Sequence, residues 1–423
     1  MPEAPGTERA SAAEQRVVVV GAGLAGLQIA LGLRENGHRG PITLVGEELH
    51  PPYDRPPLSK DLLLGTTEHS AFEFDAVGRE IELRLGTRAS GLDPVARELR
   101  VTGGDGEESI LRYDSVVLAT GAAPVLLPGT APGSGVHLLR THDDALALRS
   151  ALRPGARVVI VGAGWIGAEV ATAARKSDCE VVVLEAADRP LAGALPAEYG
   201  ERTRPWYAEA GVELRTGCRV AELSADRVRL ADGEELPADA VVLGVGARPA
   251  TDWLAGSGVA LHDNGAVLAD DRLRASVPGV EDAGVWAVGD CVSFPSTRYG
   301  ARLTVHHWDN ALNGPRTVVT NMLGADDAYD PVPYFWSDQF GRMIQYLGHH
   351  PAGDLVVERG EPDGPEGWSV LWLRESDGVP MALLAVNRPR DVAQGRRLLA
   401  LGSPIDPVAA SDSAVPLKSA VRR

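Results

Sequence analysis

The strongest constraint on this sequence is an internal repeat, in which a strand, a glycine turn, a helix, a second strand and an acid follow in order. The first copy starts with four valines at positions 17–20 and ends at Glu47, and the second starts at residues 158–161 and ends at Glu185. Each turn has the pattern Gly-x-Gly-x-x-Gly, carried by Gly21, Gly23, Leu24, Ala25 and Gly26 in the first copy and by Gly162, Gly164, Trp165, Ile166 and Gly167 in the second. Two complete copies predict two dinucleotide-binding βαβ units.

The residue types in each copy suit the binding of a pyrophosphate. The first glycine makes a tight turn, the second lets the backbone approach the phosphates, and the third lets the helix pack closely on the strand. The anion then lies at the N-terminus of the helix, where N–H groups and the helix dipole favour negative charge. Glu47 and Glu185 would each accept hydrogen bonds from an adenosine ribose.

The repeat also predicts the domain organisation. Residues 114–124 and 239–249 both indicate an apolar strand followed by a Gly-Ala-x-Pro turn, and residues 285–290 indicate a strand that returns to the first domain. From Tyr329 onward, strands at 332–340, 343–348, 355–358, 369–373 and 380–385 precede a helix at 391–401. We therefore expect an α/β fold with two Rossmann-like domains, at 1–122 plus 250–324 and at 123–249, and a C-terminal α+β domain at 325–423. Residues 1–15 are predicted to be a disordered tail, and residues 402–423 a second tail.

Composition excludes several classes of protein. The 41 basic and 58 acidic residues give a net charge of −17, which argues against nucleic-acid binding. Cys179, Cys218 and Cys291 lie far apart, so they form neither a disulfide framework nor a metal-binding cluster. Residues 1–15 lack the pattern of a signal peptide, and no apolar run approaches the ~20 residues that span a bilayer. We therefore expect a cytoplasmic protein without a membrane partner.

Further motifs make the sequence similar to one superfamily. They are Tyr-Asp-Arg-Pro-Pro-Leu-Ser-Lys at 53–60, Gly289-Asp290, His-Trp-Asp-Asn-Ala at 307–311 and Tyr-Phe-Trp-Ser-Asp-Gln at 334–339. With the two glycine turns, they make the chain resemble the FAD-dependent pyridine nucleotide-disulfide oxidoreductases, which have a glutathione reductase-like fold. Within that superfamily it resembles the ferredoxin reductases, which include the putidaredoxin, rubredoxin and Rieske-oxygenase reductases.

The resemblance implies which residues bind each cofactor. It assigns the first glycine turn and the discontinuous first domain to FAD, and the second turn and domain to NADH. For FAD it also implies Glu47, Arg55, Lys60, Ala119, Thr120, Gly121, Asp290, His307, Trp308 and Ala311. For NADH it also implies Glu169, Glu185 and Gly246.

The resemblance further implies a redox centre made of three catalytic residues. Lys60 would lie near the flavin N5, Glu169 would pair with it beside the nicotinamide, and Trp336 would lie between the flavin and a docked iron–sulfur protein. The disulfide reductases of the superfamily have a Cys-x4-Cys pair after the first βαβ unit, and residues 55–60 replace it here. Electrons therefore cannot leave through a dithiol. Adjacent histidines at 306–307 and 349–350 would point to opposite faces of a strand, so no metal is predicted.

The implied function is that of an FAD-dependent NAD(P)H:ferredoxin oxidoreductase. Hydride would pass from NADH to FAD, and single electrons would then pass to a small ferredoxin that supplies a cytochrome P450 or a Rieske-type oxygenase. Two alternatives remain: a related flavoprotein with rubredoxin, a quinone, monodehydroascorbate or oxygen as acceptor, and a nucleotide-responsive interaction protein resembling apoptosis-inducing factor. Because ferredoxins are typically acidic, docking would use basic side chains, with Arg298, Arg302, Arg388, Arg390, Arg396 and Arg397 as candidates.

Overall fold

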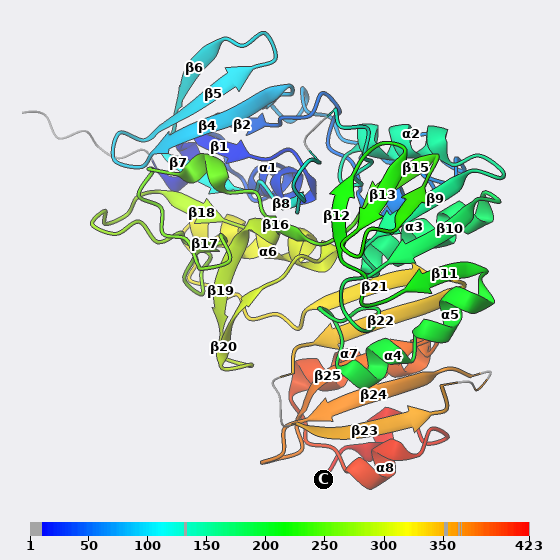
Figure 1. The fold of residues 1–423 in the computed structure, drawn as a ribbon. Coiled ribbons are helices and arrows are strands. Elements are labelled where there is room, and N and C mark those ends of the chain that lie inside the picture. The colour runs from blue at the N-terminus through cyan, green and yellow to red at the C-terminus, as the bar shows by residue number, and fades with distance from the viewer. Residues whose placement is uncertain (1–10, 131–132, 351–353, 363, 365, 423) are drawn as a thin grey trace, which may run out of the picture. The chain divides into compact units, whose positions relative to one another are not determined.

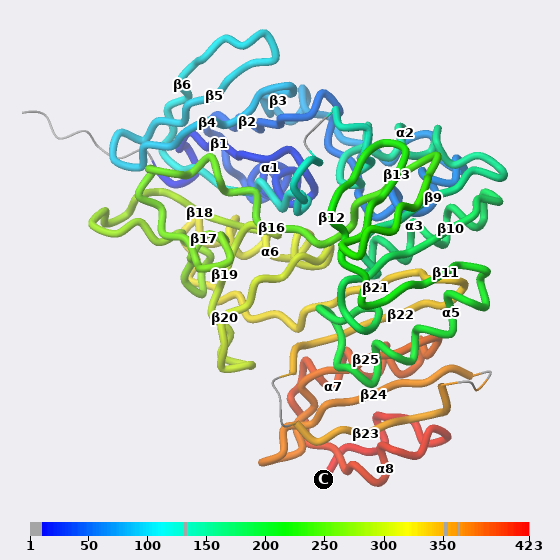
Figure 2. The backbone as a smooth tube through the Cα atoms, in the orientation of Figure 1, coloured from blue at the N-terminus to red at the C-terminus, as the bar shows by residue number. Residues whose placement is uncertain are grey.

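A computed structural model describes residues 11–130, 133–350, 354–362, 364 and 366–422. Contacts between residues divide the chain into two compact units, which can be followed along the backbone in Figure 2. The first contains Met1–Asp54, Ala71–Ala122 and Arg248–Pro331, and the second contains Arg55–Ser70, Ala123–Ala247 and Val332–Arg423. Each unit has one copy of the repeat in a parallel sheet, which confirms the predicted α/β fold class.

The core of the first unit is a five-stranded parallel sheet. Its order is β18 (Val285–Ala287), β7 (Ser115–Leu118), β1 (Val17–Val20), β2 (Ile42–Val45) and β3 (Ile81–Arg84). The four valines of β1 are all buried, as expected for a central strand covered on both faces. Pairing of β18 with β7 confirms that the chain returns to the first sheet. Helix α1 (Leu24–Glu35) packs against α6 (Trp308–Met322), where Gly32 leaves room for Val319.

Smaller elements surround this sheet (Figure 1). Two three-stranded sheets are formed by β4 (Thr87–Asp93), β5 (Glu98–Gly103) and β6 (Glu108–Arg112), and by β17 (Val267–Leu268), β19 (Val292–Ser296) and β20 (Ala301–Thr304). Short 3-10 turns lie at η3 (Asp252–Leu254) and η4 (Gly289–Cys291). Two of the five crossings between the units fall within the short strands β8 (Ala122–Pro124) and β16 (Ala247–Pro249).

The second unit repeats the parallel arrangement. Its four-stranded sheet has the order β11 (Val212–Arg215), β10 (Glu180–Leu184), β9 (Arg157–Val161) and β15 (Ala240–Leu243), with α3 (Trp165–Lys176) after the second glycine turn. Helix α2 (His142–Ala151) starts with a capping box between Thr141 and Asp144. The remaining elements are η2 (Pro56–Ser59), α4 (Ala197–Glu201), α5 (Arg204–Glu209) and the antiparallel strands β12 (Val220–Leu223), β13 (Arg227–Leu230) and β14 (Glu235–Pro237).

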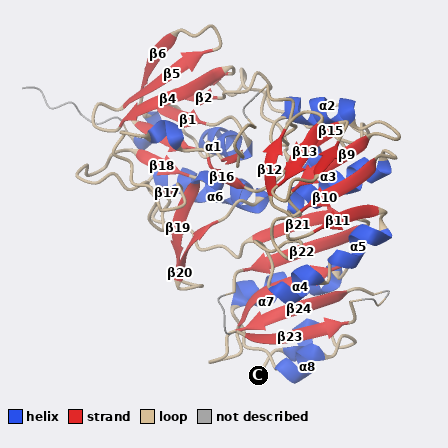
Figure 3. Cartoon of the chain, in the orientation of Figure 1, coloured by secondary structure: helices blue, strands red, loops and turns tan. Residues whose placement is uncertain are grey.

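A second sheet in the same unit is antiparallel and has five strands (Figure 3). Its order is β21 (Tyr334–Gln339), β22 (Arg342–Gly348), β25 (Pro380–Val386), β24 (Trp368–Leu373) and β23 (Leu355–Gly360). Every residue of β24 and β25 is buried, and α7 (Pro389–Leu401) packs on the sheet. All five strands and the helix agree with the predicted ranges to within two residues. Among the described residues, no helix is both long enough and apolar enough to cross a membrane.

The two expected tails need correction. Residues 402–422 form α8 (Pro407–Ser411) and the 3-10 turn η5 (Leu417–Ala420), and Ile405 and Leu417 are fully buried. The prediction of a C-terminal tail was therefore wrong. At the other end, η1 (Ala12–Glu14) is ordered, and Gln15 accepts a hydrogen bond of 3.0 Å from Ser115. Residues 1–10 of the expected N-terminal tail lie outside the described residues.

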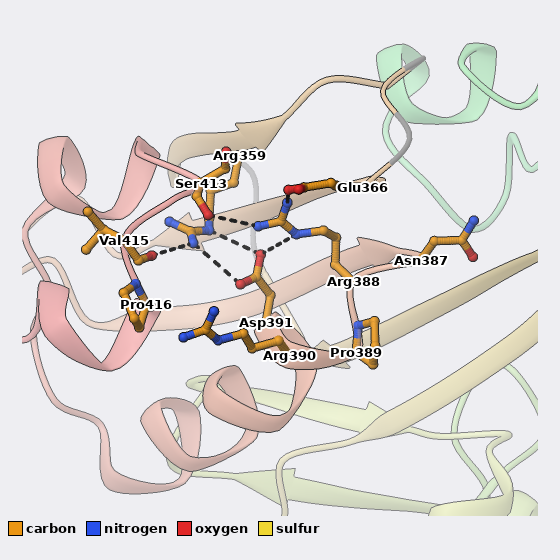
Figure 4. A pocket seen from close by; sticks show the side chains of 10 residues that line it. All are labelled: Arg359, Glu366, Asn387, Arg388, Pro389, Arg390, Asp391, Ser413, Val415 and Pro416. Carbon is orange, nitrogen blue, oxygen red and sulfur yellow. Dashed lines mark hydrogen bonds and ion pairs between the residues drawn. The ribbon is translucent and has the colours of Figure 1, made fainter.

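A buried arginine explains why the C-terminal segment folds back. Arg359 is 1% exposed, and its guanidinium donates to the carbonyl oxygens of Ala410, Asp412 and Val415 and pairs with Asp391. Asp391 also accepts from Ser369 and from Arg388, at 2.7 and 3.1 Å. Although burial alone would raise it, the pKa of Asp391 is lowered by these donors and by the arginine charges. Figure 4 shows the charged groups of Arg359, Arg388 and Asp391 turned toward one another. These three residues help to line a hollow of about 200 Å³, and their contacts hold the segment in place.

Candidate active site

The first glycine turn has two glycines that the fold itself requires. Gly21 has φ +114°, and a side chain there would overlap the carbonyl oxygen of Ala119. A side chain at Gly26 would overlap the carbonyl oxygen of Gly21. Gly23 differs, because no atom lies within 4 Å of the place where its Cβ would be. The space beside Gly23 therefore fits the close approach of a ligand phosphate to the backbone.

The second turn likewise has two glycines that the fold requires and one that leaves open space. Gly162 has φ +108° and faces the carbonyl oxygen of Gly244, and Gly167 faces the carbonyl oxygen of Gly162. The space beside Gly164 is again open to 4 Å. Gly23 and Gly164 are the N-caps of α1 and α3, and neither helix start has a side-chain cap. Both turns thus suit a bound pyrophosphate, with backbone N–H groups and the positive end of a helix dipole at the open position.

Predicted FAD residues gather at one edge of the first sheet. Because β1, β2, β7 and β18 are parallel, the segments that follow them emerge at the same edge. These segments contain Gly21, Gly23, Leu24, Ala25 and Gly26 after β1, Glu47 after β2, Ala119, Thr120 and Gly121 after β7, and Asp290 in η4 after β18. Glu47 is exposed and lies 3.7 Å from Arg88.

The start of α6 is tied to the same edge. Asn310 donates to the carbonyl oxygens of Gly289 and Val305 at 3.0 and 2.9 Å, and accepts from the Tyr329 hydroxyl at 2.7 Å. Trp308 donates to Asp54 at 2.7 Å. Burial, with a smaller effect of His306, lowers the pKa of His307 to about 4 against the opposing charge of Asp290. His307, Trp308 and Ala311 thus surround an uncapped helix start that favours an anion.

The predicted NADH residues meet at the carboxyl edge of the second parallel sheet. Gly162, Gly164, Trp165, Ile166 and Gly167 follow β9, Glu185 follows β10, and Gly246 follows β15. Glu185 accepts from the backbone N–H of Ala163 and from that of Ala187, each at 2.8 Å. These bonds fix the carboxylate against the turn. Arg189, four residues on, pairs with Asp188 at 2.7 Å.

Lys60 and Glu169 form an ion pair within the second unit. The Lys60 ammonium lies 2.7 Å from Glu169, and the two side chains are 21% and 4% exposed. Glu169 also accepts from the hydroxyls of Ser59 and Ser337, the latter at 2.6 Å. Two prolines start η2 and set the backbone before Ser59 and Lys60. The structure therefore brings together the predicted pair and adds two serine donors to it.

Strand β21 carries the third predicted catalytic residue. Trp336 stacks on Tyr334, with ring centroids 5.8 Å apart and an interplanar angle of 20°. The guanidinium of Arg396 lies 4.3 Å from the centre of the Tyr334 ring. This order of cation, tyrosine and tryptophan makes an aromatic surface with a positive charge at one end.

Other predicted residues have different surroundings. Arg55 donates to the carbonyl oxygen of Arg140, and the contacts group both Arg55 and Lys60 with the second unit. Among the docking candidates, Arg302 donates to two backbone carbonyls and Arg388 is held by Asp391. These two arginines therefore support local structure, whereas Arg390 and Arg397 are exposed.

Sequence reasoning missed four residues that support the site. Asp54 holds Trp308, Asn310 holds Gly289, and Ser59 and Ser337 donate to Glu169. All four lie inside the motifs noted in the sequence. Their partners are distant in the chain, so the motif letters alone did not indicate their roles.

Comparison with known proteins agrees with this geometry. Residues 15–314 match the family model described as pyridine nucleotide-disulphide oxidoreductase, and residues 334–421 match the reductase C-terminal model. The chain is 37% identical over 412 residues to the ferredoxin–NAD(+) reductase component of the anthranilate 1,2-dioxygenase system of Burkholderia cepacia, covering 95% of this chain and 98% of that one.

Solved structures agree as well. The crystal structure of Fdr9 is 44% identical, with a TM-score of 0.86 and coverage of 95% of this chain and 99% of that one. The covalent putidaredoxin reductase–putidaredoxin complex is 32% identical, with a TM-score of 0.87 and coverage of 96% and 97%. Since both the family model and the full-length relatives match, the chain belongs to the pyridine nucleotide-disulphide oxidoreductase family.

Proposed function

We propose that this protein is an NADH-dependent ferredoxin reductase that uses FAD. The observation that carries the proposal is the ion pair of Lys60 with the buried Glu169 carboxylate, in a chain that has two dinucleotide turns and no Cys-x4-Cys pair. Removing the Glu169 carboxylate from water costs free energy, so stability alone does not explain the pair, and a role in the chemistry of the site does. Without a dithiol, reducing equivalents have to leave by another route, which fits a separate protein acceptor.

Different residues of this chain would bind the two dinucleotides and assist the transfer of hydride. The open positions at Gly23 and Gly164 admit the two pyrophosphates, and Glu185 orients the adenosine ribose of NADH. Lys60, held by Glu169, would supply a fixed positive charge to the reacting edge of the flavin. The uncapped start of α6 favours the negative charge that reduction adds. The domains at 1–122 plus 250–324 and at 123–249 would bind FAD and NADH respectively.

FAD, when bound, supplies the conversion of one hydride, which carries two electrons, into two single-electron steps. Hydride transfer oxidises NADH to NAD⁺, and two molecules of a one-electron acceptor then complete the turnover. The acceptor we propose is a small iron–sulfur ferredoxin, with Trp336 on the route and residues 325–423 forming the interface domain. The relatives support this acceptor, because one is a ferredoxin–NAD(+) reductase component of a dioxygenase system and another was solved in complex with putidaredoxin.

The ferredoxin would in turn supply a Rieske-type oxygenase or a cytochrome P450. We also propose a cytoplasmic location. It is supported by Cys179, Cys218 and Cys291, which are free thiols, two of them buried. A reduced compartment preserves such thiols and also supplies NADH.

Anaerobic reduction of ferredoxins tests the proposal. The FAD-loaded protein is mixed with NADH and with putidaredoxin or a Rieske-type ferredoxin, and the flavin and the iron–sulfur centre are followed by their separate absorbance changes. We expect rapid flavin reduction followed by ferredoxin reduction. Parallel assays offer rubredoxin, a quinone, monodehydroascorbate or, in air, oxygen. If one of these accepted electrons while every ferredoxin stayed oxidised, the proposed acceptor would be overturned. Slow reduction of the flavin by NADH, whichever acceptor is present, would instead favour a nucleotide-responsive interaction protein.

A further inference from the structure

We propose that Ser337 is a positioning residue for hydride transfer, because it fixes the Glu169 carboxylate that holds Lys60. The inference rests on the proposed function and extends it. Ser337 belongs to the segment that matches the reductase C-terminal model, whereas Lys60 and Glu169 lie outside that segment. The C-terminal domain would then serve the first half-reaction as well as the docking of a partner.

The alternation of β21 places Ser337 on the side of the strand that faces α3. Phe335 packs on Trp165 with ring centroids 4.5 Å apart, and Ser337 donates to Glu169 at 2.6 Å. Trp165 and Glu169 are four residues apart and share one face of α3. Tyr334 and Trp336 stack on one another on the other side of the strand. One strand therefore carries both the aromatic surface and a hydrogen bond to Glu169.

Gln339 fixes the direction of that hydrogen bond. Its side-chain amide donates to the Ser337 oxygen at 3.1 Å, and both residues are 0% exposed. A hydroxyl has a single proton, so an oxygen that accepts from Gln339 offers its own proton to Glu169. The chain of donors runs from Gln339 through Ser337 to the carboxylate. The arrangement suits an ionised carboxylate, which only accepts.

Glu169 depends on these donors because it is 4% exposed and has little access to water. Its two oxygens are divided between partners: Ser337 binds Oε1, whereas Lys60 and Ser59 bind Oε2. Loss of the Oε1 donor would leave that oxygen without its partner and let the carboxylate rotate. The Lys60 ammonium would then lose its fixed position. Asp338 on β21 interacts electrostatically with Lys60 and Glu169, and also with Lys176 on α3 and Asp61 after η2.

The test is the rate of flavin reduction by NADH in variants with and without the hydroxyl. Hydrogen bonds to charged groups contribute about 1.5–3 kcal/mol, so we expect Ser337→Ala to slow reduction by roughly tenfold or more. Threonine and valine side chains have nearly the same shape, so the variants Ser337→Thr and Ser337→Val differ mainly in the hydroxyl. Threonine should keep a rate well above that of valine. Equal rates for these two variants, or an unchanged rate for alanine, would overturn the proposal.

A matched control is available in the same unit. Ser369 is also 0% exposed and donates to a buried carboxylate, that of Asp391, at 2.7 Å. Ser369→Ala should lower thermal stability and leave the rate of flavin reduction unchanged. In a Glu169→Gln background, Ser337→Ala should cause little further slowing, because its effect passes through the carboxylate. Slowing by the same factor in both backgrounds would assign Ser337 a separate role.

A second readout does not require the loaded enzyme. The thermal midpoints of the FAD-free chain with Ser337→Ala, Glu169→Gln and both changes form a double-mutant cycle. We expect the fall in thermal midpoint of the double variant to be smaller than the sum of the falls for the two single variants. An additive result would contradict a stabilising hydrogen bond between Ser337 and Glu169. This cycle and flavin reduction use no ferredoxin. A parent protein that reduces no ferredoxin would thus defeat the proposed acceptor and leave the role of Ser337 to be decided separately.

Discussion

Alanine substitutions in the second glycine turn should separate the needs of the fold from those of the ligand. Gly162 has φ +108°, and its Cβ would overlap the carbonyl oxygen of Gly244. The strained backbone costs about 1–3 kcal/mol and the overlap about another 1–3, so Gly162→Ala should lose about 2–6 kcal/mol of stability. For a domain of this size, that corresponds to a fall in thermal midpoint of roughly 5 °C or more.

Gly164→Ala should have the opposite pattern. Its φ of −79° and ψ of −170° are allowed for alanine, and nothing lies within 4 Å of the new methyl. The weaker N-cap costs about 0.5–1 kcal/mol, and the lower entropy of the unfolded chain returns about 0.4–1 kcal/mol. Stability should therefore stay nearly unchanged. The methyl would instead displace the pyrophosphate from backbone donors, and loss of one or two charged hydrogen bonds weakens NADH binding by at least about tenfold.

Two measurements on each variant decide the matter. Differential scanning fluorimetry of the FAD-free protein gives stability, and titration with NAD⁺ gives the dissociation constant. Gly21→Ala and Gly23→Ala repeat the comparison in the first turn, with retention of FAD as the ligand readout. If Gly164→Ala bound NAD⁺ like the parent, the pyrophosphate would not pass over the turn. If it lost as much stability as Gly162→Ala, the space beside Gly164 would not be open.

Four further predictions follow from the same structure. The parent should prefer NADH to NADPH by roughly tenfold to a hundredfold in kcat/KM, because the fixed Glu185 carboxylate repels a 2′-phosphate at a cost of about 1–3 kcal/mol. Glu185→Gln should reduce this ratio of kcat/KM values. Burial holds the pKa of His307 at about 4, below the ordinary 6.5, so the unfolded chain gains a proton first as the pH falls. The free energy of unfolding should therefore decrease by up to about 3 kcal/mol from pH 6.5 to 4. Urea unfolding at several pH values should show a weaker dependence on pH for His307→Gln. Trp336→Ala should leave flavin reduction unchanged and slow ferredoxin reduction at saturating ferredoxin, with Trp336→Phe retaining more of the rate; equal saturated rates for the alanine variant and the parent would remove the tryptophan from the route. Arg359→Leu should lower the free energy of unfolding by about 3–5 kcal/mol, because it leaves the buried Asp391 carboxylate short of a partner; an unchanged unfolding curve would show that Arg359 does not hold the C-terminal segment in place.

Elements whose signal is local could be predicted from the sequence. The valines of β1 and the turn glycines predicted a buried strand and a helix start, and the structure has both. The strands of the C-terminal sheet agree closely because their apolar runs are bounded by turn residues. The Lys60–Glu169 pair was also correct, although the two residues are 109 positions apart. That prediction came from the resemblance to a family, since no spacing in a single sequence indicates such a contact.

Features that depend on tertiary partners could not be predicted in the same way. Residues 402–422 show no strong pattern of a helix or a strand and therefore resemble a tail. Three of their carbonyl groups, those of Ala410, Asp412 and Val415, are nevertheless satisfied by Arg359, a residue in β23. Ser337 is likewise an ordinary strand serine until α3 brings Glu169 to it. In both cases a polar group is buried where the fold supplies its partner from a distant segment. Without that partner, moving the group from water into the protein interior would cost roughly several kcal/mol.

This dependence on distant partners bears on how the site works. The glycine turns depend on positive φ at Gly21 and Gly162 and on the close approach of each to a neighbouring segment of its own parallel sheet, at Ala119 and at Gly244. The charge pair differs, because Glu169 receives donors from η2 and from β21, two segments far apart in the chain. The dinucleotide turns are thus shaped within each parallel sheet, whereas the position of the Lys60 charge also depends on the packing of the C-terminal sheet. Variants in β21 should therefore change the chemistry of the flavin more than the affinity for NADH, which is the reverse of what variants at Gly164 should do.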